Sequence, residues 1–166
     1  MFQLRTEPES ALLYKIVLGT AQFGMNYGIA NSSGRIVQEE VSSILNFAWK
    51  NGIKCLDTAE AYGASELAIG THIEAHPNQS WEIITKVRAT GDSVVDQINS
   101  STKKLGIQPA VLLAHDTDSF LTANFQEGLA KARDHGMISK FGVSLYRQDE
   151  IERVMDAKVH PEIIQL

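Results

Sequence analysis

The sequence predicts an α/β fold, in which short parallel strands alternate with longer helices. Short apolar runs recur along the 166 residues, and each is followed by a polar loop and a segment of helical periodicity. The runs are apolar throughout, which is typical of parallel strands that are covered on both faces. Two architectures fit this alternation, a doubly wound open sheet and a (β/α) barrel. No linker rich in Pro, Gly or Ser interrupts the chain, so we expect one domain over residues 1–166.

Six strands are expected from the apolar runs, and five helices from the segments between them. The first helix follows a glycine-rich loop; Val37, Val41 and Leu45 share one of its faces, and Asn51-Gly52 ends it. The strands are expected at residues 15–18, 53–56, 81–85, 110–114, 140–143 and from 163 onward.

The later helices are marked by capping residues and by apolar spacing. Ser65 is expected to cap the second helix, which runs to about residue 76. Ser93 and Asp96 form the pattern of a capping box for the third helix, and Gly106 ends that helix. The apolar residues of the last two helices are Phe125, Leu129 and Ala132, and Ile151, Val154 and Met155.

Composition and charge argue against several classes of function. The net charge is −5 and no run of Lys or Arg stands out, so we expect no nucleic-acid partner. No apolar run approaches the roughly 20 residues of a membrane span, and residues 1–14 lack the apolar segment of a signal peptide. Cys55 is the single cysteine, which rules out an internal disulfide and fits a reducing cytoplasm. The helical histidines lack metal-ligand spacing, so no metal is expected; they are His72, His76, His135 and His160.

Polar residues stand at the ends of four successive strands. They are Asp57, Lys86, His115 and Ser144, and 86 − 57, 115 − 86 and 144 − 115 each equal 29. One polar residue after a strand is often an ordinary loop start, but three ionisable types at a constant interval favour a site. We therefore expect the four residues at equivalent places on the rim formed by the carboxyl ends of the strands, where the active sites of barrels lie.

Tyr62 follows Asp57 closely and adds a proton donor to this rim. A free tyrosine has a pKa of roughly 10, and we expect the ammonium of Lys86, paired with Asp57, to lower it. His115 can donate to a substrate carbonyl oxygen or orient it. These residue types predict reduction of a carbonyl group, in which Tyr62 protonates the oxygen while a hydride reaches the carbon.

Four segments resemble the successive signatures of the aldo-keto reductase family. The most specific is the Asp-Thr-Ala-x-x-Tyr-Gly-x-Ser-Glu pattern, and the resemblance covers about residues 15–166. It implies a (β/α)8 TIM barrel and an NAD(P)H-dependent oxidoreductase, with Asp57, Tyr62, Lys86 and His115 as the catalytic tetrad. The segments are Leu18-Gly19-Thr20-Ala21-Gln22-Phe23-Gly24, Leu56-Asp57-Thr58-Ala59-Glu60-Ala61-Tyr62-Gly63-Ala64-Ser65-Glu66, Ile84-Thr85-Lys86 and Leu112-Leu113-Ala114-His115.

The same resemblance implies NADP as the cofactor, with NAD as the alternative, and a small-molecule carbonyl compound as the substrate. Gly19 and Thr20 match the turn beside the nicotinamide ribose, and Ser144 and Gln165 match residues that hold the nicotinamide amide. Leu145 stands where the family usually has Asn, which puts one amide contact in doubt. The pyrophosphate and adenosine pocket of the family lies after the seventh and eighth strands.

The length of the chain leaves a second function open. A complete barrel needs about 250 residues and eight strands, so the resemblance implies a barrel truncated after its sixth strand. The alternative to an oxidoreductase is then a non-catalytic barrel fragment or interaction module without the cofactor-binding part. Open strand edges recruit other strands, so a homo-oligomer is expected. A lyase or isomerase that uses Lys86 as a Schiff base is disfavoured, because an adjacent carboxylate keeps the lysine protonated.

Overall fold

Six parallel strands form the sheet of the computed structural model, which describes residues 16–29, 31–32, 34–90 and 93–166. The strands lie in chain order, and each pairs with the next one along the chain. This arrangement confirms the predicted α/β fold with parallel strands, although Lys15 of the first expected strand and the segment 1–14 lie outside the described residues. The strands are β1 (Val17–Gly19), β2 (Cys55–Asp57), β3 (Glu82–Val87), β4 (Val111–Ala114), β5 (Lys140–Ser144) and β6 (Ile163–Gln165).

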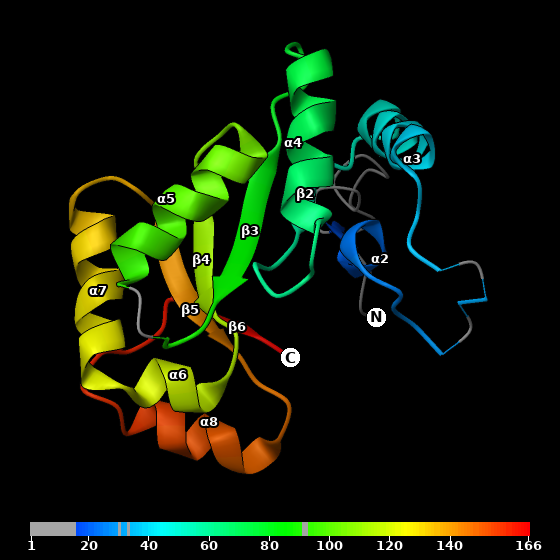
Figure 1. Cartoon of the computed structure of the whole chain (residues 1–166). Coiled ribbons are helices and arrows are strands. Elements are labelled where there is room, and N and C mark those ends of the chain that lie inside the picture. The colour runs from blue at the N-terminus through cyan, green and yellow to red at the C-terminus, as the bar shows by residue number, and fades with distance from the viewer. Residues whose placement is uncertain (1–15, 30, 33, 91–92) are drawn as a thin grey trace, which may run out of the picture.

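Helices cover one side of this sheet, and α6 and α8 lie together beyond the ends of the strands (Figure 1). The five expected helices correspond to α3, α4, α5, α7 and α8; the short helices α2 and α6 were not predicted. In the described part of the chain, every helix is too short or too polar to cross a membrane. The helices are α2 (Ala21–Gly24), α3 (Gln38–Lys50), α4 (Ser65–Ala75), α5 (Val94–Leu105), α6 (Thr117–Leu121), α7 (Ala123–Asp134) and α8 (Gln148–Met155).

The hydrophobic core lies between the helices and the outer face of the sheet. Successive side chains of a strand point to opposite faces, so Leu56, Ile83 and Leu112 face outward and are fully buried. They belong to two clusters, one under α3 and α4 and the other under α5 and α7. The opposite face carries Asp57 and Lys86, so the helical layer fixes which side chains point into the interior of the curved sheet.

The strand register differs from the constant interval of 29 residues. Asp57 pairs with Ile84 and Lys86 pairs with Leu113, an advance of 27 residues at both steps (84 − 57 and 113 − 86). An advance of 29 holds from β4 to β5, where Val111 pairs with Lys140 (140 − 111). Asp57 and Lys86 are therefore not register partners, although their side chains meet at the same rim. Because the strands of a barrel are tilted and staggered, residues at one height are not hydrogen-bonded partners.

The two capping predictions had different outcomes. Ser93 Oγ accepts a hydrogen bond from the Asp96 amide at 3.1 Å, which confirms the start of α5. Ser65 was expected to be the N-cap of α4, but the N-cap is Ala64 and Ser65 is the first helical residue. The hydroxyl of Ser65 instead donates to the backbone carbonyl of Thr20 at 2.9 Å. This tertiary hydrogen bond takes the place of the expected local bond to the first turn of α4.

Candidate active site

Lys86 lies at the centre of a group of polar side chains on the inner face of the sheet. Its Nζ donates to both carboxylate oxygens of Asp57 at 2.7 Å and to the backbone carbonyl of Thr58 at 3.0 Å. The hydroxyl oxygen of Tyr62 is 3.4 Å from the same nitrogen. The side chain of Lys86 is 2% exposed and that of Asp57 is 16% exposed. Strands β2 and β3 thus supply a largely buried ion pair with a phenol beside it.

Two opposing effects act on the pKa of Lys86. Burial lowers the pKa of Lys86, while the hydrogen bond to Asp57 and the charge of Asp57 raise it. The expectation that the carboxylate alone keeps Lys86 protonated is therefore incomplete, because desolvation opposes it. Three oxygen acceptors at 2.7 to 3.0 Å match the three protons of an ammonium group. Conversion of Lys86 to a Schiff base would leave the Asp57 carboxylate without this partner.

The pKa of Tyr62 departs from the sequence-based expectation. Burial raises the pKa of Tyr62 to about 12, and the negative charge of Asp57 adds to this effect. The expected lowering by Lys86 is therefore wrong, because desolvation of the tyrosinate and its repulsion by Asp57 dominate. The phenol is consequently protonated at neutral pH, so a proton is present for transfer. Lys86 is the cation close enough to stabilise the tyrosinate once that proton leaves.

His115 follows β4 and faces Tyr62 edge to face, with ring centroids 5.8 Å apart and an interplanar angle of 89°. Burial lowers the pKa of His115, and the positive charges of Arg88 and Lys86 lower it further. The imidazole is therefore neutral at neutral pH. Its Nδ1 is buried and has no hydrogen-bond partner among the described residues. The position of the ring beside the Tyr62 phenol, rather than this inaccessible nitrogen, makes His115 a candidate contact for a ligand oxygen.

The four residues expected to hold a cofactor lie at the ends of β1, β5 and β6. Ser144 and Gln165 are register partners, and Gln165 Nε2 donates to Asp57 Oδ1 at 3.0 Å. A Cβ added to Gly19 would have no atom within 4 Å, so open space lies in front of this residue. The hydroxyl of Thr20 is fully buried and donates to the Asp57 carbonyl at 2.9 Å, so only the backbone of Thr20 is available to a ligand.

A cavity of about 320 Å³ lies beside Tyr62 and Asp57. The short helix α2 and the loop after it form one wall, and Gln22 Nε2 donates to the Tyr27 carbonyl there at 3.0 Å. Neither Gln22 as a wall residue nor Thr58 as a partner of Lys86 was predicted from the sequence. No sequence pattern marks a backbone carbonyl as a lysine acceptor. The cavity is lined by Gly19, Thr20, Ala21, Gln22, Tyr27, Gly28, Asp57 and Tyr62.

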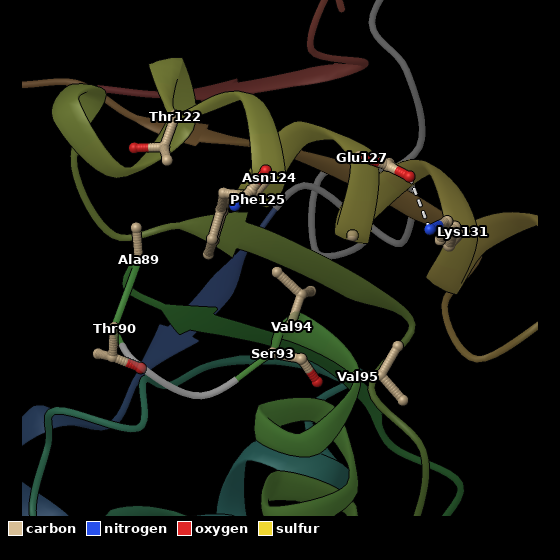
Figure 2. Close-up of a pocket in the computed structure, with 11 residues that line it drawn as sticks. Ala89, Thr90, Ser93, Val94, Val95, Thr122, Asn124, Phe125, Glu127 and Lys131 are labelled. Atoms are coloured by element: carbon tan, nitrogen blue, oxygen red, sulfur yellow. Dashed lines mark ion pairs between the residues drawn. The ribbon is translucent and has the colours of Figure 1, made fainter.

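A second cavity, of about 470 Å³, lies between the start of α5 and helix α7, apart from the predicted site residues (Figure 2). Val94 and Phe125 contribute apolar surface to it. Glu127 and Lys131 of α7 form an ion pair of 2.6 Å at its edge. Its walls contain none of the residues that surround Lys86. Within the described segments, no group of three or more His, Cys, Asp or Glu side chains is placed to hold a metal ion.

The parallel strands in chain order, with helices on their outer side, define part of a (β/α)8 barrel. The ionisable cluster around Lys86 lies at the rim where the active sites of such barrels are found. The profile of the aldo/keto reductase family matches residues 15–166, and the chain belongs to this family.

Individual relatives agree with this assignment. An aldo-keto reductase of Mycolicibacterium paratuberculosis is 27% identical over 155 residues, which cover 79% of this chain and 52% of the relative. The crystal structure of a protein assigned as an aldo-keto reductase from Pseudomonas aeruginosa shows 28% identity and a TM-score of 0.69, covering 84% of this chain and 58% of that one. An aldo/keto reductase from Klebsiella pneumoniae in complex with NADP and acetate shows 19% identity and a TM-score of 0.67, covering 85% and 49%. The chain spans about half the length of the curated relatives it matches.

Proposed function

We propose that this chain carries the carbonyl-reducing site of an NADPH-dependent oxidoreductase that acts on an aldehyde or ketone. One observation carries the proposal: Lys86 Nζ contacts the Asp57 carboxylate at 2.7 Å and the Tyr62 hydroxyl at 3.4 Å. The choice of cofactor is supported by the relative from Klebsiella pneumoniae, which binds NADP; NAD is the alternative. A reducing cytoplasmic location is supported by the free thiol of Cys55.

Each side chain of the site has a distinct role in this proposal. Tyr62 is the general acid, and its hydroxyl donates a proton to the substrate carbonyl oxygen. Lys86 stabilises the charge that develops on the phenol, and Asp57 keeps Lys86 in its charged form. His115, as a neutral ring, holds the carbonyl oxygen in place. When bound, the reduced nicotinamide supplies the hydride.

The ends of the strands fit the nicotinamide end of such a cofactor. The open space in front of Gly19 leaves room beside the ion pair for a planar ring. Ser144 and Gln165 are register partners on adjacent strands, so one amide group could contact both. The Gln165 amide donates to Asp57 through Nε2, so its Oε1 is the atom that would accept from a carboxamide. These residues would hold one end of the cofactor.

The alternative function is a non-catalytic fragment or interaction module, which is favoured by the exposed apolar residues of the sheet edges. Ile16, beside β1, is 44% exposed and Ile164 of β6 is 40% exposed. These two strands are the edges of the described sheet, and unpaired strand edges recruit other strands. We therefore propose that the chain by itself forms a homo-oligomer. We propose no nucleic-acid or membrane partner. Failure of the chain and its complemented form to bind NADPH would favour this alternative.

The variant Tyr62→Phe tests the catalytic proposal in a form of the chain complemented by the strands that complete the barrel. We expect reduction of a carbonyl substrate to be abolished while the Kd for NADPH stays nearly unchanged, because the hydroxyl transfers a proton and does not hold the nicotinamide. Stopped-flow hydride transfer and calorimetric titration measure the two quantities. Retention of even a tenth of the turnover would identify another group, such as His115, as the acid.

A further inference from the structure

We propose that the buried hydroxyl groups of Thr58 and Ser65, together with Thr20, form a positioning network that holds Tyr62 against Lys86. The network lies behind the site, and none of its hydroxyls reaches the reacting atoms. This proposal rests on the proposed function, because it assigns the network a role in presenting the general acid.

The three hydroxyls are fully buried and connect with one consistent direction of donation. Thr58 Oγ1 donates to Ser65 Oγ at 3.0 Å, and Ser65 Oγ donates to the Thr20 carbonyl at 2.9 Å. Thr20 Oγ1 in turn donates to the Asp57 carbonyl at 2.9 Å. Each hydroxyl has a single proton, and each proton has an acceptor in this arrangement. The network therefore links β1, the end of β2 and the start of α4.

Each member of the network is bonded to a segment that carries a residue of the site. The backbone carbonyl of Thr58 accepts from Lys86 Nζ at 3.0 Å, and the backbone amide of Ser65 donates to the Tyr62 carbonyl at 3.1 Å. Thr20 bonds the Asp57 carbonyl through both its amide, at 3.0 Å, and its hydroxyl. The hydroxyls thus set the distance between the Tyr62 turn and the Asp57–Lys86 pair.

The packing around the turn that contains Tyr62 restricts the positions that this turn can adopt. Gly63 has φ 59°, and a Cβ added there would lie 2.7 Å from the Gly24 carbonyl oxygen. A Cβ on Gly24 would collide with the backbone of Tyr62 and Ser65. Helix α2 therefore closes the turn from one side, and the hydroxyl network holds it from the other. Loss of a hydroxyl would loosen the turn and expose the phenol of Tyr62 to water.

Nitration of tyrosine at pH 8 tests this role, because the reagent tetranitromethane attacks the tyrosinate and the measurement needs neither cofactor nor turnover. Tyr146 is 71% exposed and serves as the reference within the same molecule; initial rates are compared, because a nitrated Tyr146 would carry a charge that acts on Tyr62. Burial holds the pKa of Tyr62 at about 12. A fall of one unit in this pKa raises the tyrosinate fraction tenfold. We expect Ser65→Ala and Thr58→Val to raise the Tyr62-to-Tyr146 nitration ratio at least tenfold.

Three control variants separate positioning from a general loss of stability. Thr58→Ser keeps the hydroxyl and should retain the wild-type nitration ratio. Ser43→Ala removes an exposed helical hydroxyl and should also leave this ratio unchanged. Leu129→Ala makes a cavity in the core under α7, so it destabilises the fold without touching the network. A raised ratio in Leu129→Ala equal to that in Ser65→Ala would overturn the proposal, since the effect would then follow stability alone.

Further outcomes are equally decisive. Thr58→Val keeps the shape of the side chain, and circular dichroism checks that the fold is kept. An unchanged nitration ratio in this variant would show that the hydroxyls do not position Tyr62. If Ser65→Ala does not fold, Thr58→Val decides by the same ratio, and its thermal unfolding curve shows whether the fold is intact at the temperature of nitration. A raised ratio in the variants, combined with absence of hydride transfer in the wild-type sequence complemented to a whole barrel, would support the network and refute the proposed function only.

Discussion

Gln165 on β6 donates a hydrogen bond to the carboxylate of Asp57 on β2, with 3.0 Å between Nε2 and Oδ1. The two residues are 108 positions apart, and their strands are not neighbours in the sheet. The curvature of the sheet therefore brings the ends of β2 and β6 together. As a consequence, the Asp57 carboxylate receives donors from both Lys86 and Gln165.

Lys86→Met should destabilise the chain by about 3 kcal/mol or more, because Asp57 would keep a largely buried charge without its cationic partner. Urea unfolding measures this change. In the Asp57→Asn background the same substitution should cost much less, since no buried carboxylate is then left unpaired. Additive effects of the two substitutions would contradict a coupled ion pair.

The 166-residue chain by itself should bind NADPH weakly. The residues proposed to contact the cofactor are Gly19, Thr20, Ser144 and Gln165, and they would hold one end of a long anionic molecule. Calorimetric titration should give a Kd well above about 1 μM, which corresponds to about −8 kcal/mol. A micromolar or tighter complex would show that these residues suffice.

Stability should fall as the pH is lowered through about 6.5. Burial lowers the pKa of both His72 and His115 below the usual value of 6.5. Between 6.5 and the lower folded value, the unfolded chain binds more protons, so protonation favours unfolding. Each histidine contributes a slope of at most about 1.4 kcal/mol per pH unit. His72→Leu should flatten the slope measured by urea unfolding, whereas substitution of the exposed His135 by Gln should not.

The chain alone should associate at micromolar concentration. Apolar residues at the two edges of the sheet are exposed, among them Val17 (43%) and Ile164 (40%), and the backbone of an edge strand is open to pairing. Sedimentation velocity should show a dimer in which strands of two copies cover one another, because most homo-oligomers have two-fold symmetry. A well-behaved monomer would refute this expectation.

The sequence by itself determined the order of the strands and helices and the candidates for the site. Apolar runs and helical periodicity depend on neighbours a few residues away, so they predicted six strands and the five longer helices. The cap at Ser93 was predicted for the same reason, since its donor lies within the same turn. The polar residues after successive strands, Asp57, Lys86 and His115, were also visible without coordinates.

Only the tertiary structure decided what depends on distance through space. The raised pKa of Tyr62 follows from burial, which no local pattern reports. The hydroxyl of Ser65 donates to the Thr20 carbonyl instead of capping its own helix, because α2, which follows Thr20, packs against α4. The contact between Gln165 and Asp57 requires the curvature of the whole sheet. Sequence patterns record which residues are polar at a strand end, whereas the packing of helices and the stagger of strands determine which of them meet.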